Sequence, residues 1–231
     1  MAASGTYTFN PSGGELALAA LGMCGVPRTS VTPQHLADAS LQSNLLLVDL
    51  ANRQPNLWTS YLYSVTMVAS TATYVLPSRA QAIQRDGAYI STTSGSTTTD
   101  RIISPISTAH YTSIPNKALT GVPNVYWFQR LITPQVTVWP VPDTATTYTL
   151  NLRLLSQIQD TDMKNGINVG LPYRWLDAYT SALASRLAIT YAPDKAEALF
   201  KLAKVAYDAA AEEDVEDVPL SITPALGGYY R

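Results

Sequence analysis

Two groups of carboxylates are the residues of this chain with the clearest capacity for catalysis. Asp160 and Asp162 lie in the polar stretch SQIQDTDMKNG. The second group is an acidic run, which comprises Glu212, Glu213, Asp214, Glu216 and Asp217. Paired carboxylates cleave glycosidic bonds when an apolar setting raises the pKa of one member. Neither group has such a setting, so we interpret both as solvated, with a cell-wall-degrading enzyme as the alternative.

Other catalytic and metal-binding patterns are missing from the sequence. His35 and His110 are too few and too far apart to suggest a metal site, and Cys24 lacks a partner histidine. A single cysteine also excludes an internal disulfide. No nucleophile elbow, P-loop or dinucleotide fingerprint occurs. We therefore expect no catalytic residue, no metal ligand and no cofactor.

Aromatic residues suggest a second alternative, a carbohydrate-binding module. Tyr126, Trp127 and Phe128 follow one another, and Trp139 lies shortly after them. Neighbouring positions in a strand point to opposite faces, so these rings cover both sides of their strand. This pattern favours a strand between two layers over a one-sided sugar platform.

Both ends of the chain are predicted to be helical. Ser12 and Glu15 have the spacing of a capping box, and a second helix runs from Thr32-Pro33 to Pro55. The predicted core stripe of that second helix is Ala37, Leu41, Leu45 and Val48, widened by Leu47 and Leu50. Near the C-terminus the stripe is Leu176, Tyr179, Leu183 and Leu187. Asp194 and Glu197 suggest a further capping box, before a helix striped by Leu199, Ala203, Ala206 and Ala210.

The middle of the chain shows the two-residue period of strands. In TYTLNLRLL one face is predicted to hold Tyr148, Leu150, Leu152 and Leu154. Val136–Trp139 is another strand, Asp86-Gly87 resembles a hairpin turn, and the polar run 91–100 predicts an exposed loop. The fold class is therefore α+β. We assign 1–58 and 171–214 to a helical bundle core, 59–170 to a β-rich insertion, and 215–231 to an extended C-terminal docking arm.

Composition limits the possible partners. Charged residues make up 14% and the net charge is −2, without a basic stripe for nucleic acid. A polar but uncharged surface suits a protein that becomes buried in an assembly. There is no signal peptide and no apolar stretch long enough to span a membrane, so we expect synthesis in a reducing cytoplasm. The arm is unusually apolar, with Pro219, Leu220, Ile222, Pro224, Leu226, Tyr229 and Tyr230. It either folds back or docks on a neighbour.

Several segments in order resemble a known family. They are NLW, TYVLP, IISPISTAHYTSIPNKALTGVPNVYWFQR, VTVWPVPDTATTYTLNLRL and LPYRWLDAYTSALASRLAITYAPD. This series resembles the head–tail adaptors of short-tailed bacteriophages. The resemblance implies a structural virion protein without enzymatic activity, with a helical bundle and a β insertion, made in the host cytoplasm.

The resemblance also implies the place of such a protein in the virion, at the head–tail junction. Adaptors of this kind form a ring, usually dodecameric, beneath the portal protein, where the ring extends the DNA channel and carries the next tail component, a nozzle or tail hub. DNA passes through without specific binding. The C-terminal segment of such adaptors commonly reaches the portal, the role expected for 215–231. The acidic run, if it faces the channel, is expected to repel DNA and let it slide.

Overall fold

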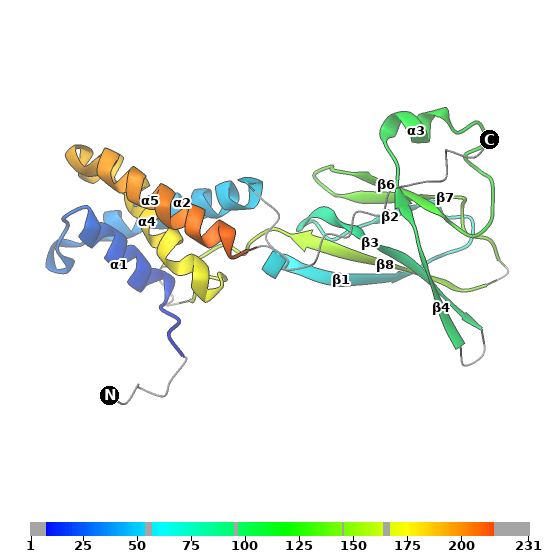
Figure 1. The fold of residues 1–231 in the computed structure, drawn as a ribbon, viewed down its shortest axis with the longest axis horizontal. Coiled ribbons are helices and arrows are strands. Elements are labelled where there is room, and N and C mark those ends of the chain that lie inside the picture. The colour runs from blue at the N-terminus through cyan, green and yellow to red at the C-terminus, as the bar shows by residue number, and fades with distance from the viewer. Residues whose placement is uncertain (1–7, 54–56, 95–96, 145, 164–166, 215–231) are drawn as a thin grey trace, which may run out of the picture.

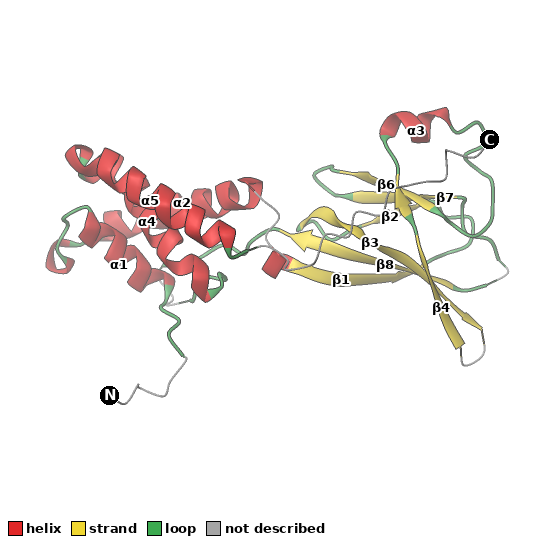
Figure 2. Ribbon diagram, in the orientation of Figure 1, coloured by secondary structure: helices red, strands yellow, loops and turns green. Residues whose placement is uncertain are grey.

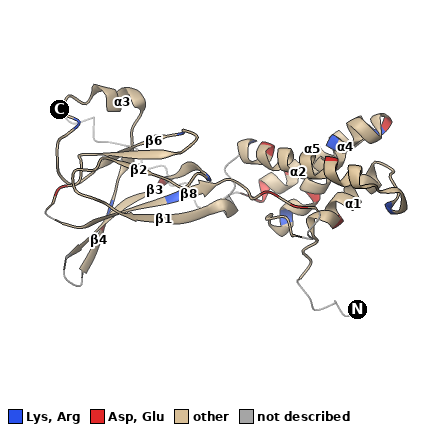
Figure 3. Cartoon of the chain, turned by 180° about the vertical axis from the view of Figure 1, so that it is seen from behind, with Lys and Arg blue, Asp and Glu red and all other residues tan. Residues whose placement is uncertain are grey.

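The computed structural model describes residues 8–214 except 54–56, 95–96, 145 and 164–166. The long helices gather at one end of an elongated molecule, and the strands with the short helix α3 (Thr108–Ser113) lie at the other (Figures 1 and 2). We call these ends the helical lobe and the β lobe. The α+β class predicted from the sequence is confirmed. The charged residues of the described part are scattered over both lobes (Figure 3).

The helical lobe is built from helices that come early and helices that come late in the chain. Its long helices are α1 (Gly13–Met23), α2 (Pro33–Arg53), α4 (Leu176–Tyr191) and α5 (Ala196–Glu212). Short 3-10 helices are η1 (Arg28–Ser30), η2 (Leu57–Thr59), η3 (Tyr173–Trp175) and η4 (Pro193–Lys195). Helix α4 packs against α1, α2 and α5. Its predicted stripe is confirmed, because Leu176, Tyr179, Leu183 and Leu187 are all buried.

Helix α1 begins as predicted. Ser12 Oγ accepts a hydrogen bond from the Glu15 amide at 3.3 Å, and the Ser12 amide donates to Glu15 Oε2 at 2.8 Å. The Ser12 amide and the Ser12 hydroxyl, which also donates to Glu15 Oε2, lower the pKa of Glu15. The predicted capping box of α5 is wrong. Helix α5 follows the turn η4 with Lys195 at its N-cap and no side-chain cap, and Glu197 pairs with Lys201 at 2.7 Å.

The buried face of α2 is only partly the predicted one, because Leu47 and Leu50 are buried as predicted but the rest of the predicted stripe is not. The buried residues are Ala39, Ser43, Leu46, Leu47 and Leu50, whereas Ala37, Leu41, Leu45 and Val48 are exposed. Both sets recur every three or four residues, so both form a line along the helix. Ser43 can belong to the buried set because its hydroxyl hydrogen-bonds the hydroxyl of Tyr179 on α4. We call the exposed set the α2 stripe.

The β lobe consists of two four-stranded sheets. The first has the order β1-β8-β3-β4 and is antiparallel, and the second has the order β2-β7-β6-β5, in which β5 and β6 are parallel. The first contains β1 (Ser60–Thr66), β8 (Tyr148–Ser156), β3 (Ala80–Ser94) and β4 (Thr97–Ile102). The second contains β2 (Thr73–Val75), β7 (Gln135–Trp139), β6 (Val125–Gln129) and β5 (Ser104–Pro105), and α3 (Thr108–Ser113) follows β5.

The two sheets share one hydrophobic core. Strand β8 contributes Tyr148, Leu150, Leu152 and Leu154, the face predicted from its alternation, and β7 contributes Val136 and Val138. None of these residues belongs to the core of the helical lobe. The chain passes between the lobes after α2 and again before α4.

Two turn predictions for the middle of the chain are wrong. Strand β3 continues through Asp86-Gly87, where its register with β8 shifts and Asp86 has a φ of 56°. The expected loop 91–100 is part of a hairpin, because β3 reaches Ser94 and pairs with β4 from Thr97 onward. The hairpin projects beyond the sheets (Figure 1) and β4 is exposed throughout. Threonine favours extended backbone, which explains a strand in so polar a run.

Candidate functional site

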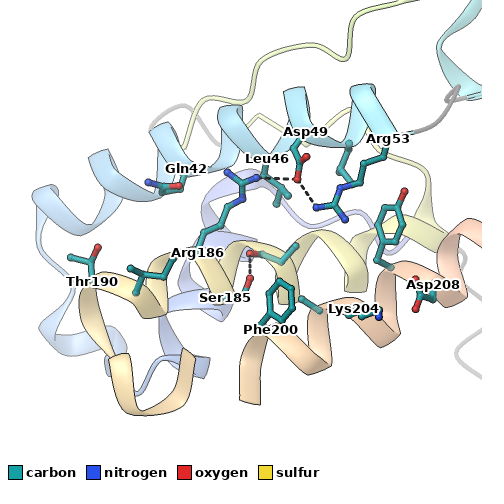
Figure 4. A pocket seen from close by; sticks show the side chains of 15 residues that line it. Gln42, Leu46, Asp49, Arg53, Ser185, Arg186, Thr190, Phe200, Lys204 and Asp208 are labelled. Carbon is teal, nitrogen blue, oxygen red and sulfur yellow. Dashed lines mark hydrogen bonds and ion pairs between the residues drawn. The ribbon is translucent and has the colours of Figure 1, made fainter. Parts of the chain in front are cut away.

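A groove on the helical lobe is a candidate binding site. It lies between α2 and α5 with α4 as its floor, and its volume is about 690 Å³ (Figure 4). Helix α2 contributes Gln42, Leu46, Asp49 and Arg53, and α5 contributes Phe200, Lys204, Tyr207 and Asp208. At one end the apolar side chains of Ile189 and Phe200 are exposed, by 71% and 64%. The groove therefore combines an apolar end with a charged wall.

Asp49 organises the charged wall. Its Oδ2 accepts hydrogen bonds from Arg53 Nη2 at 2.8 Å and Arg186 Nη2 at 3.1 Å (Figure 4). The hydrogen bond from Arg53 and the two positive charges hold the pKa of Asp49 below its usual value. The Arg53 guanidinium also lies 5.0 Å from the centre of the Tyr207 ring. A carboxylate held ionised in this way cannot act as a general acid at neutral pH, so the groove suits recognition and not acid catalysis.

The two predicted carboxylate groups have different surroundings. Asp160 is exposed and Asp162 is half-buried in the segment after β8. Glu212 and Glu213 are exposed at the end of α5. Asp214 is buried and forms an ion pair with Arg174, so its carboxylate does not contribute to an exposed acidic surface on the single chain. Glu216, Asp217 and the seven apolar residues named in the arm lie outside the described residues.

An aromatic cluster lies where the two lobes meet. The Trp58 and Trp175 rings are 5.4 Å apart, and Tyr207 meets Trp175 edge-on at 5.5 Å. The Arg174 guanidinium lies 5.9 Å from the Trp58 ring. Since Arg174 also pairs with Asp214, this cluster fixes the last described residue before the arm. No sequence pattern predicts this cluster, because its members come from three segments that are distant in the chain.

The histidines and the cysteine have structural surroundings. Thr32 donates its amide to His35 Nδ1 at 3.0 Å, and His110 is exposed on the short helix α3. Cys24 is buried and its thiol donates to the Ala184 carbonyl at 3.4 Å, while burial raises its pKa. Within the described ranges, no group of three or more His, Cys, Asp or Glu side chains could hold a metal ion. No helix in the same ranges is long and apolar enough to span a membrane.

Neighbouring segments contact both tryptophans of the second sheet. Trp127 stacks on Tyr111 of α3 at 4.8 Å, and its indole N–H donates to Thr108 at 3.2 Å. The indole N–H of Trp139 donates to the Asn116 carbonyl at 3.0 Å. Both rings are half-buried. Helix α3 thus occupies a face of Trp127 that a sugar ring would need.

Comparison with known proteins identifies a family. A family model described as SU10 adaptor protein matches residues 19–223, which include both lobes from within α1 onward. A search of the curated proteins finds no match.

Proposed function

Because the chain belongs to the SU10 adaptor protein family, a phage head–tail adaptor family, we propose that it forms a ring, usually of twelve copies, beneath the portal protein. The family is structural, and its members are virion proteins. In our proposal the ring stands at the head–tail junction, extends the DNA channel and carries the next tail component, a nozzle or tail hub. The match over both lobes is the observation that carries this proposal.

The surface of the single chain supports a role in assembly. Large apolar side chains are exposed on α2, α4 and α5, and only 14% of the residues are charged. Such a surface is costly in water and becomes favourable when other chains cover it. The groove adds a concave site whose carboxylate is already ion-paired, which suits docking better than acid–base catalysis.

The arm is proposed to attach the adaptor to the portal. Its sequence carries the apolar and aromatic residues Pro219, Leu220, Ile222, Pro224, Leu226, Tyr229 and Tyr230. The ion pair between Arg174 and the buried Asp214 fixes the point from which the arm starts. Prolines restrict a free chain, so less conformational entropy is lost when the arm binds.

The acidic run is proposed to face the DNA channel. Glu212 and Glu213 are exposed, and Glu216 and Asp217 follow in sequence. Asp214 is left out of this proposal because Arg174 neutralises it. A ring of such carboxylates repels phosphates, so DNA slides without binding. Replacing these four residues by Gln or Asn should slow DNA ejection from otherwise normal particles, and unchanged ejection would count against the proposal.

The experiment that tests the adaptor role is native mass measurement with the portal ring of the same phage. We expect a stoichiometric complex of adaptor and portal, and we expect its loss when residues 215–231 are removed. If the complex forms without the arm, the adaptor role is still supported but the proposed docking role of the arm is contradicted. Failure to form any complex over a range of salt concentrations would contradict the proposed function.

A further inference from the structure

A second exposed apolar line runs along α5. It consists of Ala198, Leu202, Val205 and Ala209, which are all exposed, and we call it the α5 stripe. Its spacings of four, three and four residues keep these side chains on one side of the helix. The groove residues Phe200 and Lys204 lie on another side of α5. The α5 stripe is therefore separate from both the bundle core and the groove.

The α2 stripe has a similar form. Its spacings are four, four and three residues, so in each stripe the first and last residues are eleven positions apart, or about 16 Å along the helix. Leu41, Leu45 and Val48 are 60%, 49% and 46% exposed, and Leu202 and Val205 are 47% and 68% exposed. No described residue covers either line. Two apolar lines of equal length on different helices give the chain two distinct surfaces to bury.

From this pairing we infer that the α2 stripe of one copy packs against the α5 stripe of the next copy. The inference rests on the proposed ring and names the surfaces that join its members. A contact between two different surfaces of one chain is heterologous, and repeated contacts of this kind close into a ring when the rotation allows it. A contact of one stripe with its own copy gives only a dimer.

The two stripes also complement each other in shape. The α2 stripe has three large side chains and the α5 stripe has small residues at both ends, so the large side chains of one helix have space between the ridges of the other. Neither stripe contains a charged residue. Charged residues border both lines: Asp38 follows Ala37 on α2, and on α5 Lys201, which is ion-paired with Glu197, precedes Leu202 while Asp208 precedes Ala209.

Cysteine cross-linking tests the inference directly. One chain with an epitope tag carries Leu41→Cys, Leu45→Cys or Val48→Cys, and another with a different tag carries Leu202→Cys or Val205→Cys. Pairs are joined by a short bismaleimide, both in purified concentrated protein and in particles assembled with both chains. Asp208→Cys, on the groove side of α5, is the matched control, and the unmodified chain reports any background from buried Cys24.

We expect product that carries both tags from α2–α5 pairs, at least tenfold more than from pairs with Asp208→Cys. Products that link α2 to α2, or α2 to the portal protein, would overturn the inference. The absence of any cross-linked product in both settings would also overturn it. The two proposals can fail separately. Absence of the chain from particles would refute the adaptor role. Cross-linking of the purified protein would still test whether the α2 and α5 stripes contact each other.

Charge variants give an independent readout of the same contact. Leu45→Glu alone and Val205→Lys alone should each abolish association in native mass spectra, while circular dichroism shows unchanged folding. Mixing the two variants should restore association, because every contact then joins either two native stripes or a Glu with a Lys. A contact between two α2 stripes predicts no recovery on mixing, and that result would overturn the inference.

Discussion

Two separate hydrophobic cores predict that the two lobes unfold as separate cooperative units. Leu183 on α4 is fully buried in the core of the helical lobe, and Leu152 on β8 is fully buried in the core of the β lobe. The cores share no residue, and the chain crosses between the lobes only twice. Leu183→Ala and Leu152→Ala therefore perturb one core each, by the same chemical change.

The expected magnitude follows from the cavity that each substitution leaves. Truncating a fully buried leucine to alanine costs about 2–5 kcal/mol of unfolding free energy. For a unit of roughly 100 residues, a cost of about 3 kcal/mol lowers the midpoint of its own thermal transition by roughly 10–20 °C. If the whole chain unfolded as one unit, the same cost would lower one common midpoint by only about 6–12 °C.

Hydrogen exchange followed by mass spectrometry separates these cases peptide by peptide. Under conditions in which exchange follows unfolding, a loss of about 3 kcal/mol accelerates exchange roughly a hundredfold. Leu183→Ala should accelerate exchange in peptides from α4 and α1 and leave β8 and β3 unchanged, and Leu152→Ala should do the reverse. Equal acceleration in both lobes by either variant would refute the reasoning, and with it the proposed division into 1–58 with 171–214 and 59–170.

Three further predictions concern single contacts in the helical lobe. The hydrogen bond from Tyr191 to Asp38 and partial burial raise the pKa of Tyr191 to about 12. The raised pKa stabilises the folded state below pH 10, and this stabilisation is lost as the pH rises through 12. Asp38→Asn should therefore lower the titration midpoint of the Tyr191 phenol, measured by ultraviolet absorbance against a Tyr191→Phe reference. An unchanged midpoint would contradict the prediction. Ser43→Ala leaves the buried hydroxyl of Tyr179 without its partner and should cost about 1–3 kcal/mol in urea unfolding. Adding Tyr179→Phe should recover part of that cost, and strictly additive costs would argue against the bond. Cys24 is buried with a raised thiol pKa, so a thiol reagent at neutral pH should modify it only as the protein unfolds, and rapid labelling of the native protein would contradict its burial.

Sequence periodicity predicted the buried face correctly in those elements whose large apolar residues all face one core. The four-residue stripe of α4 and the alternation of β8 both became buried, because their opposite faces hold few large apolar side chains to compete for the core. In α2 the same reasoning correctly included Leu47 and Leu50 but placed the rest of the buried face wrongly. Leu41 and Leu45 have the spacing of core residues, whereas the real core face contains Ser43, which only the hydroxyl of Tyr179 makes acceptable there.

The polar stretch 91–100 shows a different limit of sequence reasoning. Its Ser and Thr residues have the composition of a loop, yet they form the exposed end of β3 and most of β4. Paired hydroxyls contribute across the strands, with Ser91 Oγ donating to Asp100 Oδ1 at 2.6 Å and Thr93 and Thr98 3.3 Å apart. Among the described residues of 91–100 no side chain is fully buried, so the stretch has no apolar alternation for the sequence to reveal.

The error in α2 carries information about function. A stripe that binds another chain must have the same spacing as a stripe that binds the chain's own core, since both pack against a helix or sheet. An apolar line that the fold leaves exposed is therefore the pattern expected of a surface that a neighbour buries. The start of the arm lies elsewhere, at the Arg174–Asp214 pair beside Trp58. If the stripes join copies and the arm joins the portal, a substitution at Leu45 and removal of 215–231 affect different contacts, so their effects on ring formation and on portal binding should be separable. A loss of copy-to-copy contact on removing the arm alone would show that the two surfaces are coupled.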